Sequence, residues 1–98
     1  MTTVAEQIRE VRAKIDDSLI VVQSDQNASP VLVAVVGEFA KKAEKAARAD
    51  DERAAVIELE QAGDSAKAAA EADPGVSDAT RQAVLDAHLA ICITKSKL

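Results

Sequence analysis

The scarcity of large side chains is the feature that most constrains how this chain can fold. Its 98 residues include a single aromatic residue, Phe39, and about a fifth of its positions are alanine. Alanine is the best helix former but buries little apolar area, and burial is worth only about 25 cal/mol per Å². A core of Ala, Val, Leu and Ile is therefore stable only where helices approach closely or where a second chain covers them. Both conditions point to a helical bundle.

Apolar residues recur every three or four positions along four segments, a spacing typical of amphipathic helices. Start and stop signals bound these segments. Ser29 followed by Pro30 is the clearest of them, since serine caps a helix N-terminus and proline fits the first turn. The predicted helices run from about Thr3 to Ser24, from Pro30 to a break at Asp50 and Asp51, from there to Asp73-Pro74-Gly75, and from the cap Ser77 to about Lys95.

Each predicted helix has one apolar face, which we expect to form the core. The expected core residues, helix by helix, are Val4, Ile8, Val11, Ile15 and Val22; Leu32, Val36, Phe39, Ala43 and Ala46; Val56, Leu59, Gly63, Ala66 and Ala70; and Val84, Leu85, His88, Leu89, Ile91 and Cys92.

Four segments of similar length joined by short turns predict one all-α domain over residues 1–98, folded as an antiparallel up-down four-helix bundle. Two alternatives stay open. No Pro or Gly separates Ala46 from Val56, so the second and third helices could be one long central helix in a dimeric three-helix chain. The β-branched residues at 19–22 and 31–36 could instead form a short hairpin. We recognise no internal repeat in the sequence.

The charge distribution argues against nucleic-acid binding. The net charge is −5, and residues 51–73 hold seven acids and two bases. Phosphate contacts dominate nucleic-acid affinity, so an acidic domain is a poor binder. Lys41, Lys42, Lys45 and Arg48 form a local basic stripe without aromatic neighbours, which we interpret as a solvated helix face.

No segment predicts a membrane span or a secretory signal. The longest apolar run, Val31–Val36, is too short to cross a bilayer, and acids near the N-terminus stand where a signal peptide would be apolar. Cys92 is alone, so no intrachain disulfide argues for an oxidising compartment. We therefore expect a cytoplasmic protein that does not bind membranes. The C-terminal Ser96-Lys97-Leu98 matches the peroxisomal address, a match that we interpret as coincidence.

The most reactive side chains are those of His88 and Cys92, four residues apart and so on one helix face. This spacing suits two ligands of a soft metal, but the chain has no further His or Cys to complete a site. A histidine on a late helix in a chain of this size is similar to the small helical carrier domains of sugar-uptake systems. That resemblance implies a phosphoryl acceptor at His88, although none of the motif residues of those domains is matched. We interpret the pair as packing.

No other pattern predicts a cofactor, a metal or catalysis. Di-iron bundles use an acid with a histidine three residues later on two helices, and this motif does not occur here. We therefore interpret the acids of the third helix as solvated and expect no catalytic residues. The acids concerned are Glu58, Glu60, Asp64 and Glu71.

The bulky residues on either side of the first loop predict an interaction surface. In a helix, four consecutive large apolar residues point in every direction, so only part of them can face an internal core. The remainder would form an exposed apolar patch, which is typical of a protein interface. The residues predicted at this interface are Leu19, Ile20, Val21, Val22, Val31, Leu32, Val33 and Val35.

These observations favour a small helical interaction or structural module that self-associates, most simply as a twofold homodimer, and docks a protein partner through the apolar helix-end patch. The alternative is a small carrier or enzyme that uses His88, as a phosphoryl acceptor or as a metal ligand together with Cys92.

Overall fold

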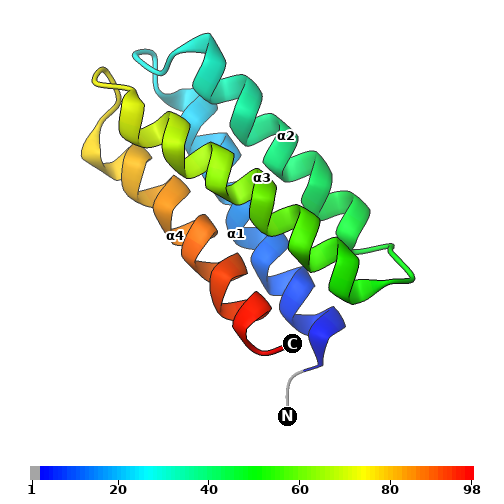
Figure 1. Ribbon diagram of the computed structural model, residues 1–98. Helices are drawn as coiled ribbons and strands as arrows, with labels where there is room; N and C mark the ends of the chain where they lie inside the picture. The colour runs from blue at the N-terminus through cyan, green and yellow to red at the C-terminus, as the bar shows by residue number, and fades with distance from the viewer. Residues whose placement is uncertain (1–2) are drawn as a thin grey trace.

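The computed structural model describes residues 3–98 and contains four helices. They are α1 (Val4–Ser24), α2 (Pro30–Ala46), α3 (Glu52–Ala72) and α4 (Asp78–Ser96), and no strand occurs within residues 3–98. Consecutive helices run in opposite directions and pack into a bundle of 39 × 20 × 18 Å (Figure 1). The predicted four-helix bundle is confirmed. The alternatives of a long central helix and of a β-hairpin are wrong.

Side-chain caps set where the helices begin. Thr3, Ser29, Asp51 and Ser77 each accept a hydrogen bond from the backbone N–H three residues later, at 3.0–3.1 Å. The cap at Asp51 separates α3 from α2. Folding the chain back there buries the apolar faces of both helices against each other, whereas one continuous helix would keep these two faces apart.

The buried side of three helices is the predicted one. All the residues expected in the cores of α2 and α3 are buried, and in α1 only Val4 is half-buried. In α4 the prediction is wrong in its rotation, because Leu89 is 56% exposed. The buried residues of α4 are Thr80, Val84, Ala87, Ile91 and Thr94.

Two threonines explain the rotation of α4. Large apolar residues lie nearly all round this helix, so hydrophobicity alone does not determine which side is buried. Thr80 and Thr94 enter the core because their hydroxyls find acceptors: Thr80 Oγ1 donates to Asp25 Oδ2 at 2.7 Å, and Thr94 Oγ1 donates to a backbone carbonyl one turn earlier at 3.1 Å.

The two halves of the chain repeat each other at a spacing of 48 residues, which corrects our reading that no repeat is present. Helix α1 corresponds to α3, since Val4 precedes Glu52 by that spacing, and α2 corresponds to α4. Every buried residue in the first pair of helices has a buried counterpart 48 positions later in the second pair. The corresponding residues are Ile8, Val11, Ile15, Ser18 and Val22 with Val56, Leu59, Gly63, Ala66 and Ala70, and Leu32, Val36, Phe39, Ala43 and Ala46 with Thr80, Val84, Ala87, Ile91 and Thr94.

Side-chain size hides this repeat in the sequence. Only five of the 48 corresponding positions carry the same residue, too few to reveal it by identity. At corresponding core positions, one half of the chain can have a large side chain where the other half has a small one. Phe39 packs against Gly63, whereas their counterparts are the small Ala87 and the large Ile15, both fully buried. Total core volume is kept while individual residues differ.

Candidate interaction surfaces

Of the eight residues predicted at the helix-end interface, two are fully buried and six lie at least partly on the surface. Val22 and Leu32 have no exposed surface and belong to the core of the chain. Their inclusion in the interface is wrong, because each occupies the inner position of its helix. The other six form what we call the helix-end surface: Leu19, Ile20, Val21, Val31, Val33 and Val35.

Exposure within the helix-end surface is uneven. Ile20 and Val31 are 60% and 66% exposed, while the remaining four side chains are half-buried. Leu19 and Val33 line a shallow groove between α1 and α2. Ile20 and Val21 instead border a depression beside the start of α4. The surface therefore wraps around the end of the α1–α2 hairpin instead of forming one flat face.

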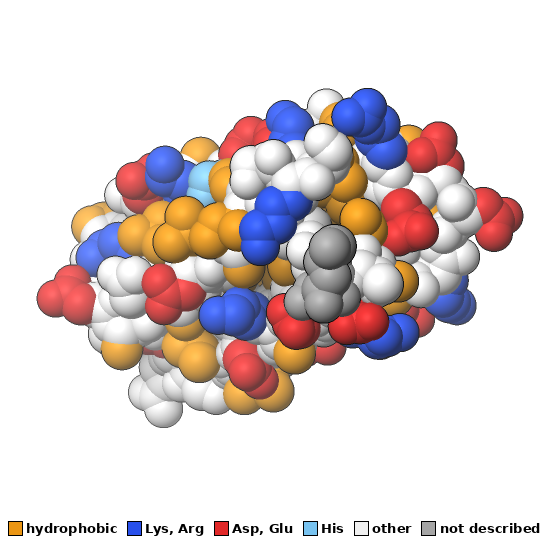
Figure 2. All heavy atoms as spheres, turned by 90° about the horizontal axis from the view of Figure 1, so that it is seen from below, with side chains coloured by type: hydrophobic (Ala, Val, Ile, Leu, Met, Phe, Trp, Pro, Cys, Tyr) orange, Lys and Arg blue, Asp and Glu red, His pale blue; other side chains and the backbone are white. Residues whose placement is uncertain are grey.

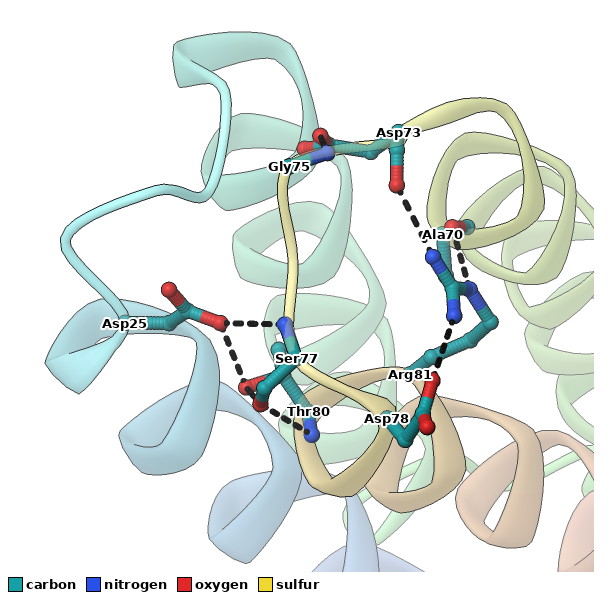
Figure 3. Close-up of polar contacts among 8 residues, drawn as sticks. All are labelled: Asp25, Ala70, Asp73, Gly75, Ser77, Asp78, Thr80 and Arg81. Carbon is teal, nitrogen blue, oxygen red and sulfur yellow. Dashed lines mark hydrogen bonds and ion pairs between the residues drawn. The ribbon is translucent and has the colours of Figure 1, made fainter.

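Two aspartates tie the loops together at this end of the bundle. Asp25 follows α1, and its Oδ2 accepts the Ser77 N–H at 3.1 Å as well as the Thr80 hydroxyl (Figure 3). Asp73 stands 48 residues later, and its Oδ2 accepts the Ser29 N–H at 2.8 Å. Each carboxylate thus holds the start of a helix in the other hairpin, so the exchange is reciprocal. This reciprocity is what an approximate twofold axis between the hairpins requires.

The same hydrogen bonds favour the charged form of both aspartates. The Thr80 hydroxyl, with the N–H groups of Ser77 and Asn27, lowers the pKa of Asp25. The N–H groups of Ser29 and Gly75 lower the pKa of Asp73. These carboxylates have their acceptors satisfied within the chain, and we assign them a structural role.

Arg81 hydrogen-bonds the C-terminal end of α3, at the same end of the bundle as Asp25 and Asp73. Its Nε donates to the carbonyl of Ala70 at 3.3 Å, and its Nη2 donates to the carbonyl of Asp73 at 3.1 Å (Figure 3). Nη1 lies 3.2 Å from Asp78 Oδ1. The guanidinium therefore donates to two carbonyls at the end of α3, where regular helical partners are missing; the Ala70 carbonyl accepts one further hydrogen bond, from the Asp73 N–H at 3.4 Å. Because its three nitrogens contact atoms of the same chain, we assign Arg81 a structural role.

His88 and Cys92 lie together, as their spacing predicts, with Cys92 Sγ 3.5 Å from His88 Nε2. The same ring nitrogen is 2.7 Å from Asp64 Oδ1 on α3. A relay for nucleophilic catalysis needs the thiol and the acid on opposite ring nitrogens. Here the thiol lies closer to Nε2, which Asp64 also contacts, than to Nδ1 at 3.9 Å, so the arrangement differs from that of such a relay.

The surroundings of Cys92 also oppose a reactive thiol. Burial raises the pKa of Cys92, and the carboxylates of Glu60 and Asp64 raise it further. Within residues 3–98, no three His, Cys, Asp or Glu side chains converge closely enough to hold a metal ion. Glu60 is instead paired with Lys95 at 2.7 Å, and the exposed carboxylate of Asp64 with His88. Both contacts join α3 to α4.

A second apolar surface was missed by the sequence analysis. Leu89 and Ile93 are 56% and 46% exposed and line a groove of about 250 Å³ between α1 and α4. Figure 2 shows hydrophobic side chains gathered in a band close to the histidine. We call this surface the α1–α4 groove. The available signal was the excess of large apolar residues in α4, which is more than one buried face can hold.

None of the four helices is long and apolar enough to cross a membrane, as far as residues 3–98 are concerned. Comparison with protein-family models, with curated proteins and with solved structures finds no match to this chain. A functional assignment therefore depends on the surfaces described above.

Proposed function

We propose that the protein is a small helical interaction module that self-associates and docks a protein partner through the helix-end surface. The observation that carries the proposal is the exposure of Ile20 and Val31, the two most exposed large hydrophobic side chains that the structure describes. Large apolar side chains that are exposed at one end of a bundle favour contacts with other proteins.

The repeat supports this proposal by providing an internal comparison. The positions that correspond to Ile20 and Val31 hold Ala68 and Ala79, which are also exposed. Since the same position in the same fold accepts alanine, the larger side chain is not needed to pack the bundle. We therefore attribute the larger side chains of Ile20 and Val31 to a contact with another chain. The simplest occupant of the surface is a second copy related by a twofold axis.

The proposal is tested by the solution mass of wild type and of the Ile20→Ala/Val31→Ala variant, measured by light scattering across a dilution series. Circular dichroism on the same samples follows helicity. We expect the wild-type mass to rise with concentration and the variant to associate more weakly, with its helicity unchanged because alanine stands at both corresponding positions.

A matched control is Ile57→Ala, which shortens an exposed hydrophobic side chain on α3 outside the helix-end surface. We expect this change to leave association unaltered. A double variant that associates as strongly as wild type would contradict a role for the helix-end surface in self-association.

The alternative of a carrier or enzyme at His88 has less support. Its ring nitrogen Nε2 is engaged by Asp64, and only 15% of the His88 side chain is exposed. An acceptor of phosphoryl groups needs a nitrogen that an incoming phosphate can reach. His88→Gln tests this alternative, which expects loss of phosphoryl transfer or metal binding with the fold retained.

A further inference from the structure

We propose that the α1–α4 groove is a second self-association site, which binds the same groove of another copy of this chain in antiparallel orientation. This contact is separate from the helix-end surface and does not depend on it. Four features support it: exposed aliphatic side chains, an internal comparison, a self-complementary charge pattern and matching registers.

The apolar part of the contact is formed by Leu89 and Ile93. They lie one helical turn apart on α4 and line the groove together, roughly half of each side chain being exposed. Residues four apart on a helix lie on one face, so the two side chains form a short continuous stripe.

The fold does not need aliphatic residues there. The positions that correspond to Leu89 and Ile93 in α2 are occupied by Lys41 and Lys45, both exposed. Lysine at these positions is compatible with the same helix packing in the other half of the molecule. The stripe on α4 is therefore explained by contact with something outside the chain.

The charges along the groove identify a second copy as the partner. Asp86 and Lys97 stand at opposite ends of the apolar stripe on α4, and Lys14 and Glu10 stand at the matching ends on α1. Each end of the groove thus carries one acid and one base. A twofold axis lying in the groove face, across both helices, reverses the direction of each helix. It places Asp86 against Lys97 of the second copy and Lys14 against Glu10 of the second copy.

The register of the apolar and charged pairs agrees. The midpoint between Leu89 and Ile93 and that between Asp86 and Lys97 differ by about half a residue, or roughly 0.75 Å along a helix. The contact between Asp25 and Ser77 fixes how α1 lies against α4. Counting back from it along the antiparallel helices brings the midpoint of Glu10 and Lys14 level with the other two, within about one and a half residues. A single twofold axis can therefore relate the apolar pair and both charged pairs to their counterparts in the second copy.

The size of the surface predicts a weak dimer. Two exposed aliphatic side chains from each copy form a small apolar centre, and the surrounding ion pairs are exposed to solvent, where such pairs contribute little. We expect dissociation in the micromolar range or weaker. Because each of the two proposed contacts is twofold, a chain that uses both assembles beyond a dimer at high concentration.

The first test replaces Leu89 and Ile93 by lysine, the residue found at both corresponding positions in α2. Sedimentation equilibrium over micromolar to millimolar concentrations measures association, and circular dichroism measures helicity. We expect the Leu89→Lys/Ile93→Lys variant to keep its helicity and to lose this contact. In an Ile20→Ala/Val31→Ala background, in which the helix-end contact is weakened, we expect it to be a monomer.

The second test is a charge exchange, which remains informative even if the lysine variant fails to fold. Asp86→Lys alone and Lys97→Asp alone each place like charges together and should weaken the dimer about tenfold. The double variant Asp86→Lys/Lys97→Asp restores opposite charges across the axis and should recover association.

Equal association of wild type and the Leu89→Lys/Ile93→Lys variant overturns the inference, as does a double charge variant that does not recover. Neither result bears on the helix-end surface, which is tested by the Ile20→Ala/Val31→Ala change alone. A wild-type chain that is monomeric at all concentrations would refute both self-association contacts.

Discussion

Gly63 lies directly against the ring of Phe39: a methyl group added to this glycine would stand 3.1 Å from Cζ of Phe39 and 3.3 Å from Cγ2 of Ile91. The only aromatic side chain in the protein is thus accommodated by a residue without a side chain on the facing helix. The three positions concerned are fully or largely buried, so little room exists for the ring to move.

We predict opposite effects for two glycine substitutions. Gly37→Ala should stabilise the protein by about 0.5–1 kcal/mol, because alanine favours the helix and nothing lies within 4 Å of the added Cβ. Gly63→Ala gains the same helix propensity but overpacks the core at a cost of about 1–3 kcal/mol, so it should be destabilising. Urea unfolding measures both. Adding Phe39→Leu should make Gly63→Ala more favourable than it is beside phenylalanine, and additive effects would contradict direct contact.

The hydrogen bonds that Asp25 and Asp73 accept across the loops lead us to predict a loss of stability in acid. Both have a pKa below the ordinary value of 3.8, so their stabilisation is complete above that value and is lost as the pH falls through the lower pKa of the folded state. Asp25→Asn/Asp73→Asn should lower the melting temperature at neutral pH, and the difference from wild type should shrink below about pH 4. The exposed Asp17→Asn serves as control. A melting-temperature difference that is the same at pH 3 and pH 7 would refute the assignment.

Arg81 should contribute to stability more than an ordinary surface arginine. Arg81→Lys removes the planar fork that reaches the carbonyls of Ala70 and Asp73, and the expected loss is about 1–2 kcal/mol. Asp78→Asn changes only the exposed partner of the same guanidinium, with an expected effect of about 0.5 kcal/mol or less. Thermal and urea unfolding compare the two. Equal losses would mean that the ion pair, not the carbonyl contacts, carries the effect.

The Cys92 thiol should be slow to alkylate in the folded protein, since burial and the nearby carboxylates raise its pKa above the ordinary 9.0. Iodoacetamide at mildly alkaline pH should react faster with the urea-unfolded chain. Two variants shift the rate in opposite directions: Asp64→Asn removes a negative charge and should accelerate the reaction, whereas Lys67→Gln removes a positive charge and should slow it. Identical rates for both variants would contradict this account.

The sequence was sufficient for the architecture because cap residues and the apolar spacing of α1, α2 and α3 agree with one another. Ser29 and Ser77 cap the helices that they were expected to cap, and Asp51, at the expected break, caps α3. The rotation of α4 could not be read from hydrophobicity, because the acceptor that lets Thr80 enter the core is Asp25, 55 residues away in sequence. Such long-range hydrogen bonds leave no local pattern.

The candidate surfaces were predicted less well than the fold. Hydrophobic runs indicated that some side chains would remain outside, but not which ones. Val22 and Leu32, which were expected both in the core and at the interface, are core residues, while Leu89, expected inside, lines the α1–α4 groove. Only the comparison of one half with the other separates the apolar residues that the fold needs from those it does not, and that comparison requires the structural alignment of the two hairpins.

The 48-residue repeat has a consequence for the order of the chain. The start of α1 and the end of α4 lie at the same end of the bundle as the turn between α2 and α3 (Figure 1). A circular permutant that begins at Asp51, passes from Leu98 through a short linker to Thr3 and finishes at Ala46 would keep all four caps and place the same helices in the same positions. Either hairpin can thus stand first in the chain without a change in how the four helices pack, because each occupies an equivalent half of the bundle.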